Sequence, residues 1–141
     1  MRRIFSVPNY PYWQQHLALL VLRLGFGLLM LPHGWAKWQR VWAGETSFTD
    51  PIGIGEYPSL LLATFAETLC ACLVVLGALY RLALLPLIVL TVVAAFVVHA
   101  HDPLDVKEHA LLYLFAYVPM WWLGAGKYSL DAWLFGLRKN R

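Results

Sequence analysis

Residues 58–81, with the sequence PSLLLATFAETLCACLVVLGALYR, decide the fold class of this chain. The stretch is apolar on both sides of a single carboxylate, Glu67, and it is closed by Arg81. About 20 apolar residues, at about 1.5 Å each, span a hydrocarbon core of about 30 Å, so the length predicts a membrane-crossing helix. A carboxylate at such depth costs at least about 2.5 kcal/mol on insertion scales. We therefore expect Glu67 to face other helices or a ligand, and to have a partner.

The composition of the whole chain is also typical of a membrane protein. Its 141 residues are 60% hydrophobic and only 13% charged, whereas about a quarter of the residues in a soluble domain are charged. The net charge is +3, but the basic residues lie mostly beside apolar segments near the two ends of the sequence. This pattern indicates membrane topology and not nucleic-acid binding. We expect one integral membrane domain, surrounded by lipid and without a nucleic-acid partner.

The apolar segments predict an all-α fold, an integral membrane four-helix bundle. The expected crossings cover residues 16–35, 58–80, 82–98 and 108–124. A polar, glycine-rich stretch over residues 36–57 predicts a long outer loop between helices 1 and 2, and loops of this length tend to be functional. Near the C-terminus, Ser129 is expected to cap an interfacial amphipathic helix over residues 129–138. The aromatic N-terminal residues 1–15 do not resemble a signal peptide, so we expect them to be retained.

The distribution of Lys and Arg predicts the orientation. With four crossings, both termini lie on the same side as the turn at Arg81, and this side holds most of the basic residues. They are Arg2, Arg3, Arg81, Lys127, Arg138, Lys139 and Arg141, against Lys37, Arg40 and Lys107 on the other side. The positive-inside rule then places both termini in the cytoplasm. The long loop and the His-rich connection over residues 99–109 would share the outer face.

Arg23 is a second charge inside a predicted crossing. It lies roughly 18 Å from the outer end of its helix, and Glu67 lies roughly 14 Å from the outer end of the next helix, at about 1.5 Å per residue. These depths predict a buried Arg23–Glu67 ion pair, in which each charge makes the other tolerable in hydrocarbon. The pair could carry chemistry, or it could only fix the register of two helices. Cys70, on the same face as Glu67, is interpreted as a packing residue, and Cys72 points to nearly the opposite face.

Histidines gather near the expected outer face, at His33, His99, His101 and His109. They match metal ligands in type, but their spacing fits no dedicated zinc pattern. Haem would require paired histidines at mid-membrane positions, so we expect neither haem nor metal. The remaining functional interpretation is a pocket for a quinone or similar head group, in which histidines donate hydrogen bonds or move protons and Tyr113 packs against the ring. For each histidine, the alternative is that it lies at the membrane interface without any functional role.

Taken together, these residues resemble the DoxX family of small four-helix membrane proteins. The resemblance rests on R-L-G-F-G (23–27), H-G-W-A-K (33–37), Ala66-Glu67, G-x-x-x-R (77–81), the acidic Glu108 and G-A-G-K-Y-S-L-D (124–131). It implies a membrane-embedded bundle that is often described as an oxidoreductase subunit. Relatives include the DoxD subunit of thiosulfate:quinone oxidoreductase, mycobacterial proteins that join superoxide dismutase and a sulfurtransferase-like protein, and distant membrane chaperones. Membership alone therefore does not settle function.

Two functional hypotheses follow. The first is a quinone-linked redox subunit, of a system that handles sulfur, thiols or oxidative stress, in the cytoplasmic (inner) membrane of a prokaryote. Its catalytic residues would be Glu67, Arg23 and His33, and its quinone-binding residues Lys37, His99, Glu108, His109 and Tyr113. Lys37 could also attract an anionic substrate such as thiosulfate. The second is a non-enzymatic assembly, scaffold or chaperone-like subunit, in which the same polar residues lock the bundle. Either would have a protein partner or form a homo-oligomer, and whether the chain is an enzyme stays open.

Overall fold

The computed structural model describes residues 12–136, which form helices joined by loops and contain no strand. This confirms the all-α fold class. The elements are α1 (Tyr12–Trp42), α2 (Glu56–Phe65), the π-helical turn η1 (Ala66–Cys70), α3 (Ala71–Leu76), α4 (Tyr80–Val93), the π-helical turn η2 (Ala94–Val98), α5 (Leu104–Leu123) and α6 (Leu130–Gly136). Residues 1–11 and 137–141, which hold several of the basic residues used to predict topology, lie outside the described residues.

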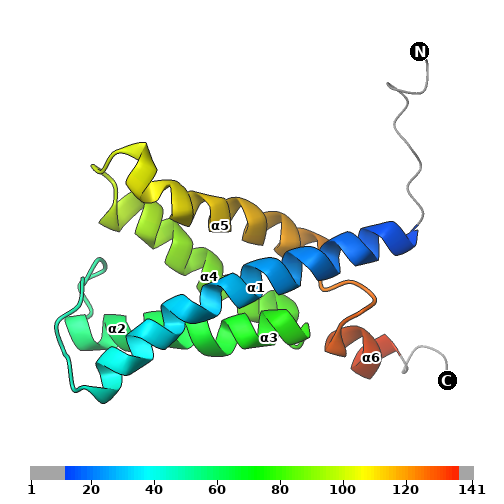
Figure 1. Ribbon diagram of the computed structural model, residues 1–141, viewed down its shortest axis with the longest axis horizontal. Helices are drawn as coiled ribbons and strands as arrows, with labels where there is room; N and C mark the ends of the chain where they lie inside the picture. The colour runs from blue at the N-terminus through cyan, green and yellow to red at the C-terminus, as the bar shows by residue number, and fades with distance from the viewer. Residues whose placement is uncertain (1–11, 137–141) are drawn as a thin grey trace, which may run out of the picture.

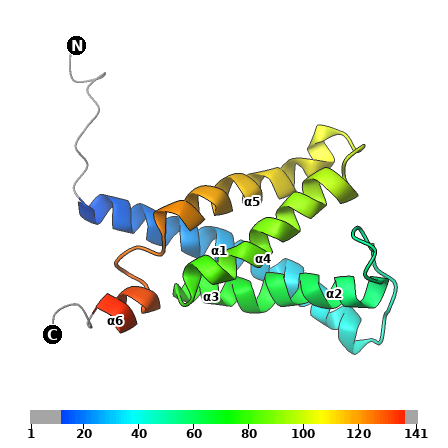
Figure 2. The ribbon, with the colours of Figure 1, turned by 180° about the vertical axis from the view of Figure 1, so that it is seen from behind.

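The long helices run back and forth along the length of the molecule, each in roughly the opposite direction to the one before it (Figure 1). The segment α2–η1–α3 runs along α1, and α5 returns beside α4. α4 packs against η1 and α3 but diverges from α2, so the two pairs of helices spread apart toward the end that carries the loops 43–55 and 99–103. Figures 1 and 2 show this divergence from opposite sides.

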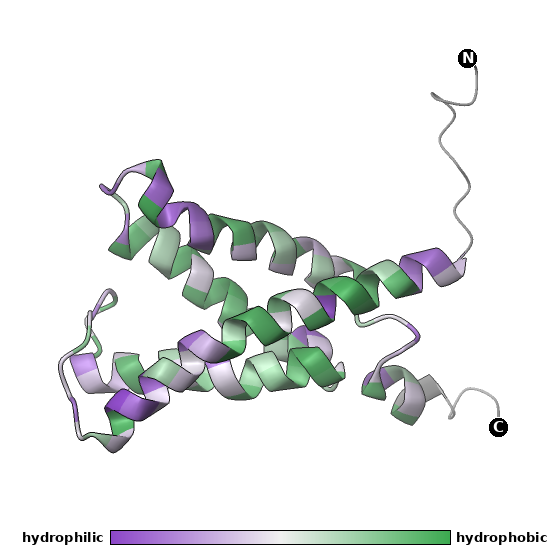
Figure 3. Ribbon diagram, viewed as in Figure 1, coloured by the Kyte–Doolittle hydropathy of each residue, from purple (hydrophilic) through white to green (hydrophobic). Residues whose placement is uncertain are grey.

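Within residues 12–136, three helical segments are long and apolar enough to cross a membrane: Tyr12–Trp42, Glu56–Leu76 and Tyr80–Val98. Figure 3 shows hydrophobic residues along these helices and hydrophilic residues gathered toward the end with the long loop. Large apolar side chains such as Leu29 and Phe115 are exposed on the helix surfaces, as expected for contact with lipid. α5 is a helix of 20 residues, but its first turns carry Asp105, Lys107 and Glu108. The fourth crossing therefore stays a prediction.

Several helices begin up to four residues before the predicted positions, as α5 does at Leu104, and two further differences in helix boundaries affect the site and the chain reversal. α1 continues to Trp42, beyond the predicted end at Trp35, so Lys37 lies in a helix and not in the outer loop. The second helical segment ends at Leu76, because Gly77 has a φ of +68° and Leu79 a φ of +44°. These left-handed conformations reverse the chain over residues 77–79, so α4 begins at Tyr80.

The core lies where α1, η1, α3, α4 and α5 meet. It contains the fully buried side chains of Leu84, Leu87, Tyr117 and Met120. The hydroxyl of Tyr117 donates a hydrogen bond to the Phe26 carbonyl oxygen at 3.3 Å, which satisfies a polar group in the core.

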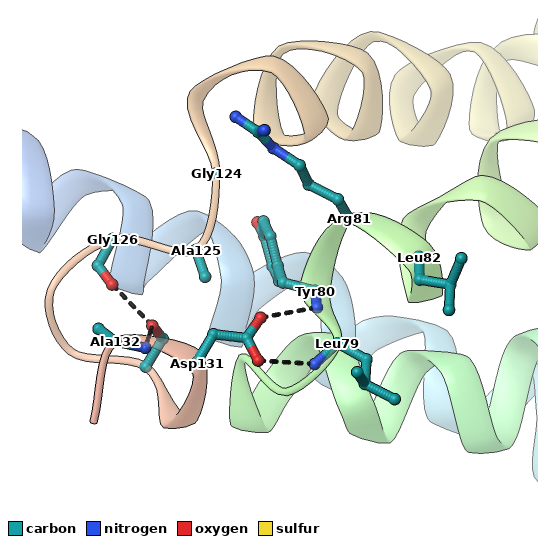
Figure 4. Close-up of a pocket in the computed structure, with 10 residues that line it drawn as sticks. Leu79, Tyr80, Arg81, Leu82, Gly124, Ala125, Gly126, Asp131 and Ala132 are labelled. Carbon is teal, nitrogen blue, oxygen red and sulfur yellow. Dashed lines mark hydrogen bonds between the residues drawn. The ribbon is translucent and has the colours of Figure 1, made fainter. Parts of the chain in front are cut away.

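Asp131 ties the C-terminal segment to the turn between α3 and α4. Its two carboxylate oxygens accept hydrogen bonds from the amides of Leu79 and Tyr80, both at 2.9 Å (Figure 4). The Asp131 amide donates to the Gly77 carbonyl oxygen, also at 2.9 Å. The carboxylate thus satisfies amides at the start of α4 that have no partner within the helix, and its charge is favourable at a helix N-terminus.

Ser129 begins the last helix, as the sequence predicted. Its hydroxyl accepts a hydrogen bond from the Ala132 amide at 3.1 Å, which is the usual geometry of a helix N-cap. The same hydroxyl donates to the Gly126 carbonyl oxygen at 2.7 Å. Capping by Ser129 is therefore confirmed for α6, whose described end is Gly136.

Asp50 organises the loop over residues 43–55. Its carboxylate accepts hydrogen bonds from the amides of Ile54 at 3.0 Å and Gly55 at 2.8 Å, and from the Ser59 hydroxyl at 3.0 Å. These bonds join the loop to the first turn of α2. The Gly55 amide, assisted by Ser59 and Ile54, lowers the pKa of Asp50 below its ordinary value of 3.8.

The Asp131 contact predicts a stability effect. Asn at position 131 has only one accepting oxygen, so one amide at the start of α4 would lose its partner in Asp131→Asn. We expect a loss of about 1–2 kcal/mol in the free energy of unfolding, measured by thermal unfolding in detergent. Glu45→Gln is the control, because it removes only the exposed Arg40–Glu45 ion pair and should have little effect. Equal midpoints for Asp131→Asn and wild type would contradict this account.

The Asp50 contacts predict a pH dependence. A carboxyl group whose pKa is lowered by folding contributes stability above its unfolded pKa, and this contribution is lost as the pH falls through the folded pKa. The stability difference between wild type and Asp50→Asn should therefore be constant from pH 7 to about pH 5 and shrink below about pH 4. Unfolding midpoints of both proteins across this range test the prediction, and a difference that persists unchanged at pH 3 would refute it.

Candidate functional site

Arg23 does not contact Glu67. Its buried guanidinium donates hydrogen bonds to the carbonyl oxygens of Ala125 at 3.2 Å and Tyr128 at 2.5 Å, in the segment between α5 and α6. Gly77 makes room for the guanidinium, because a Cβ at that position would collide with it. The predicted Arg23–Glu67 ion pair is therefore wrong: backbone oxygens of the C-terminal segment solvate Arg23 instead.

Glu67 is paired with Lys37. The Lys37 ammonium nitrogen Nζ lies 2.9 Å from Oε1 and 2.6 Å from Oε2 of Glu67. The Glu67 side chain is 8% exposed and that of Lys37 is 20% exposed, so the pair is largely buried. The expectation that Glu67 is buried and partnered is confirmed, but the partner is a lysine that the sequence-based boundaries placed in a loop.

The backbone around Glu67 is unusual. In η1 the Ala71 amide donates to the Ala66 carbonyl oxygen, five residues back, which widens the helix by one residue. Such π-helical turns are rare and frequently occur at functional sites. The hydroxyl of the next residue, Thr68, donates to the Thr64 carbonyl oxygen at 2.5 Å and accepts from the Trp38 indole at 3.3 Å. These bonds fix the turn from which Glu67 projects.

Gly34 allows α1 to approach this turn closely. A Cβ at Gly34 would lie 2.7 Å from the carbonyl carbon and 2.8 Å from the carbonyl oxygen of Glu67, and 2.5 Å from Cγ2 of Thr68. Two of these three atoms belong to backbone, which cannot rotate away. Lys37 lies three residues further along the same face of α1 and reaches Glu67 from there.

A pattern in the sequence could have identified Lys37. The buried residues in the middle of α1 are Arg23, Gly27, Met30 and Gly34, which recur every three or four residues, and Lys37 continues the series. The pattern was missed because the helix was expected to end at Trp35. Extending the helix through the tryptophan-rich stretch would have placed Lys37 on the buried face.

A cavity of about 600 Å³ adjoins the ion pair, between the diverging α1–α2 and α4–α5 pairs. Most of its wall is apolar. Its ionisable lining residues are His33, Lys37, Glu67, His99, His109 and Tyr113. This size and lining, mostly apolar with a few convergent polar groups, are typical of small-molecule sites, which measure about 300–1,000 Å³.

The cavity brings together most of the predicted site residues, but not Arg23 or Glu108. Arg23 lies about four turns of α1 away from Lys37, and Glu108 is exposed near the start of α5; neither lines the cavity. The rings of His33 and Tyr113, which both line the cavity, pack edge to face, with centroids 6.2 Å apart and planes nearly perpendicular. At the rim, His99 Nδ1 lies 2.7 Å from Asp102 Oδ2.

The sequence reasoning missed the contribution of the long loop. Phe48, Ile52 and Ile54 line the cavity, although Ile52 and Ile54 are partly exposed. The sequence did contain a signal for this contribution, because large apolar side chains are unexpected in a loop that is otherwise polar and glycine-rich.

Among residues 12–136, no group of three or more His, Cys, Asp or Glu side chains could hold a metal ion, and Cys70 and Cys72 are free thiols.

Comparison with protein families decides where this chain belongs. The DoxX family model matches residues 18–100, more than half of the 141 residues. The chain belongs to the DoxX family. Family membership and the three apolar helices together indicate a membrane protein. The match covers the Lys37–Glu67 pair, Gly34 and His33, whereas α5 and the segment 124–131 of this DoxX protein lie beyond it. Comparisons with curated proteins and with solved structures gave no match.

The close approach at Gly34 predicts contrasting effects of two glycine substitutions in α1. Gly34→Ala should lower stability and displace Glu67, because the added Cβ meets the Glu67 backbone. Gly25→Ala should be neutral or stabilise by up to about 1 kcal/mol, because nothing lies within 4 Å and alanine favours helix. Thermal unfolding of both variants in detergent tests this. Equal effects of the two substitutions would show that α1 does not approach Glu67 as described.

Proposed function

We propose that this DoxX protein is a membrane subunit that binds a quinone in the cavity beside Lys37 and Glu67 and serves quinone-linked redox chemistry. One observation carries the proposal: a buried ion pair lies on the wall of a cavity that is otherwise mostly apolar and large enough for a small molecule. An ionisable residue inside a membrane protein marks a functional site by default, because its insertion is costly.

The polar groups of the cavity suit the oxygens of a quinone ring. Such oxygens accept hydrogen bonds, and the Lys37 ammonium has three donors, of which Glu67 engages two. A neutral histidine ring at His33 or His109 can donate a further hydrogen bond, as can the Tyr113 hydroxyl. The apolar wall suits the faces of the ring. In this proposal Glu67 holds Lys37 in position.

When bound, a quinone supplies chemistry that takes up two electrons and two protons. The residues of this chain would handle the protons: His33 lies on α1, and His99 and His109 line the cavity near the outer loops. The electrons would come from a partner protein that oxidises a reduced sulfur compound or a thiol, as the family resemblance implies. Neither Arg23 nor Glu108 is needed, since neither lines the cavity.

The proposal includes a topology. α5, with 20 residues, would be the fourth crossing, so that both termini lie in the cytoplasm of a prokaryote and the cavity lies toward the outer side of the cytoplasmic membrane. α6 would lie along the cytoplasmic surface of the membrane, with the exposed Trp133 and Leu134 in the interface.

A second candidate function is that of an assembly or scaffold subunit without catalytic activity. The observation in its favour is that each of the three charged side chains between the helices has a structural partner: Arg23 binds the C-terminal segment, and Lys37 and Glu67 pair with each other. In this case the ion pair would only set the register of α1 against η1, as buried polar groups do in some proteins.

Extraction of bound quinone from the detergent-purified protein, read by absorbance and mass spectrometry, tests the proposal. Wild type should retain quinone. The double variant Lys37→Met with Glu67→Met should stay folded, because an apolar pair often replaces a buried ion pair without loss of stability, and should bind quinone at least about tenfold more weakly. Lys37→Met alone should be destabilised by about 3 kcal/mol, because it leaves a buried carboxylate unpaired.

The outcomes separate the two candidate functions. If wild type neither retains quinone nor binds added quinone, the quinone proposal fails and the scaffold function is favoured. If the folded double variant binds quinone as wild type does, the ion pair is not part of the site. Gly25→Ala serves as the control, since this exposed glycine lies away from the cavity.

A further inference from the structure

We infer that the cavity is open to the lipid between α2 and α4, and that it selects a quinone with a long apolar tail that enters sideways from the bilayer. This inference rests on the proposed function and adds the class of quinone and its route of access. It is carried by three features of the cavity: lining residues that also face outward, the divergence of two helices, and an apolar loop at the aqueous end.

The side walls of the cavity continue onto the outer surface of the helices. Leu62 and Phe65 of α2, and Val89 of α4, all line the cavity. The same residues are 55%, 45% and 60% exposed, respectively. Exposed fractions this large, in residues of both helices, indicate that the cavity is open at its side and not enclosed. Because Glu56–Leu76 and Tyr80–Val98 are candidate membrane spans, the surface that these side chains reach is the lipid-facing one.

The arrangement of the helices explains the opening. α4 packs on η1 and α3 near its start and then separates from α2, as seen from both sides in Figures 1 and 2. Pro86 lies within α4 on the cavity wall, where it removes one helix hydrogen bond and favours a bend. The cavity, which Glu67 lines, thus lies in the gap between α2 and α4, where these two helices diverge toward the outer loops.

The aqueous end of the cavity is unsuited to a soluble anion. The loop over residues 43–55 contributes Phe48, Ile52 and Ile54 to the lining, and Asp50 ties this loop to α2. An anion such as thiosulfate would have to lose its water to pass these apolar side chains, and this desolvation opposes the path. The Lys37 ammonium, which could attract the anion, is already paired with the Glu67 carboxylate.

An amphiphile fits the whole cavity. Its polar head would lie beside Lys37, His33 and Tyr113, and its tail would leave between Leu62 on one side and Val89 on the other. The tail would then run in hydrocarbon, where transfer from water is favourable for every methylene group. A quinone with an isoprenoid tail already resides in the bilayer, so it reaches the gap without crossing water.

Binding of two quinones to the protein in phosphatidylcholine vesicles tests the inference, one with an isoprenoid tail and one with the same ring but no tail. Wild type should bind the tailed quinone at least about tenfold more tightly. Val89→Trp and Leu62→Trp, which fill the gap from opposite sides, should each weaken binding of the tailed quinone about tenfold and change binding of the tailless one less than about twofold. Using both variants keeps the test valid if one does not fold.

Val21→Trp is the matched control. Val21 is 62% exposed on α1, close to the 60% of Val89, but it does not line the cavity. This variant should bind both quinones as wild type does. If wild type binds both quinones equally and neither Val89→Trp nor Leu62→Trp changes the affinity for the tailed quinone, lateral access is refuted but the quinone site is not. If wild type binds neither, the proposed function itself fails.

Discussion

The main constraint on this structure is that the Glu67 carboxylate, which is buried among the helices, must have a partner. Glu67 lies at mid-length of an apolar segment, and its charge is tolerable there because Lys37 donates to both of its oxygens. Other features serve this contact. Gly34 lets α1 come against the Glu67 backbone, and the π-helical turn η1, held by Thr68 and Trp38, sets the direction of the side chain.

The two ends of the helical assembly are built differently. At one end Arg23, Gly77 and Asp131 join α1, the turn between α3 and α4, and the segment after α5 through hydrogen bonds to backbone groups. At the other end α4 separates from α2, and a cavity of about 600 Å³ lies between them. A firmly closed end allows the opposite end to stay open, because the helices are still held in a defined relation.

The segments that resemble the DoxX family divide between these two ends. R-L-G-F-G, G-x-x-x-R and G-A-G-K-Y-S-L-D supply Arg23, Gly77 and Asp131 to the closed end, and Arg81 adds a hydrogen bond to the Trp122 carbonyl oxygen at 3.3 Å. H-G-W-A-K and Ala66-Glu67 supply His33, Lys37 and Glu67 to the cavity, and Gly34 of the first motif lets α1 approach Glu67. The first group thus has an architectural role in this structure, and the second group lies at the cavity where we propose that quinone binds.

The sequence by itself determined the all-α class, three of the four expected membrane-crossing helices, the burial of Glu67 and the cap at Ser129. These properties follow from local quantities, namely hydropathy over a window of residues, the cost of a charge in hydrocarbon, and the amides left free at a helix start. Only the tertiary structure decided that Lys37 and not Arg23 is the partner of Glu67. The depth of each residue along its own helix cannot determine the partner of Glu67. The partner also depends on where α1 ends and on how each helix is rotated. It depends further on the backbone oxygens that the C-terminal segment brings to Arg23. The cavity likewise arises from the divergence of α4 from α2, which is a relation between distant segments that no local pattern encodes.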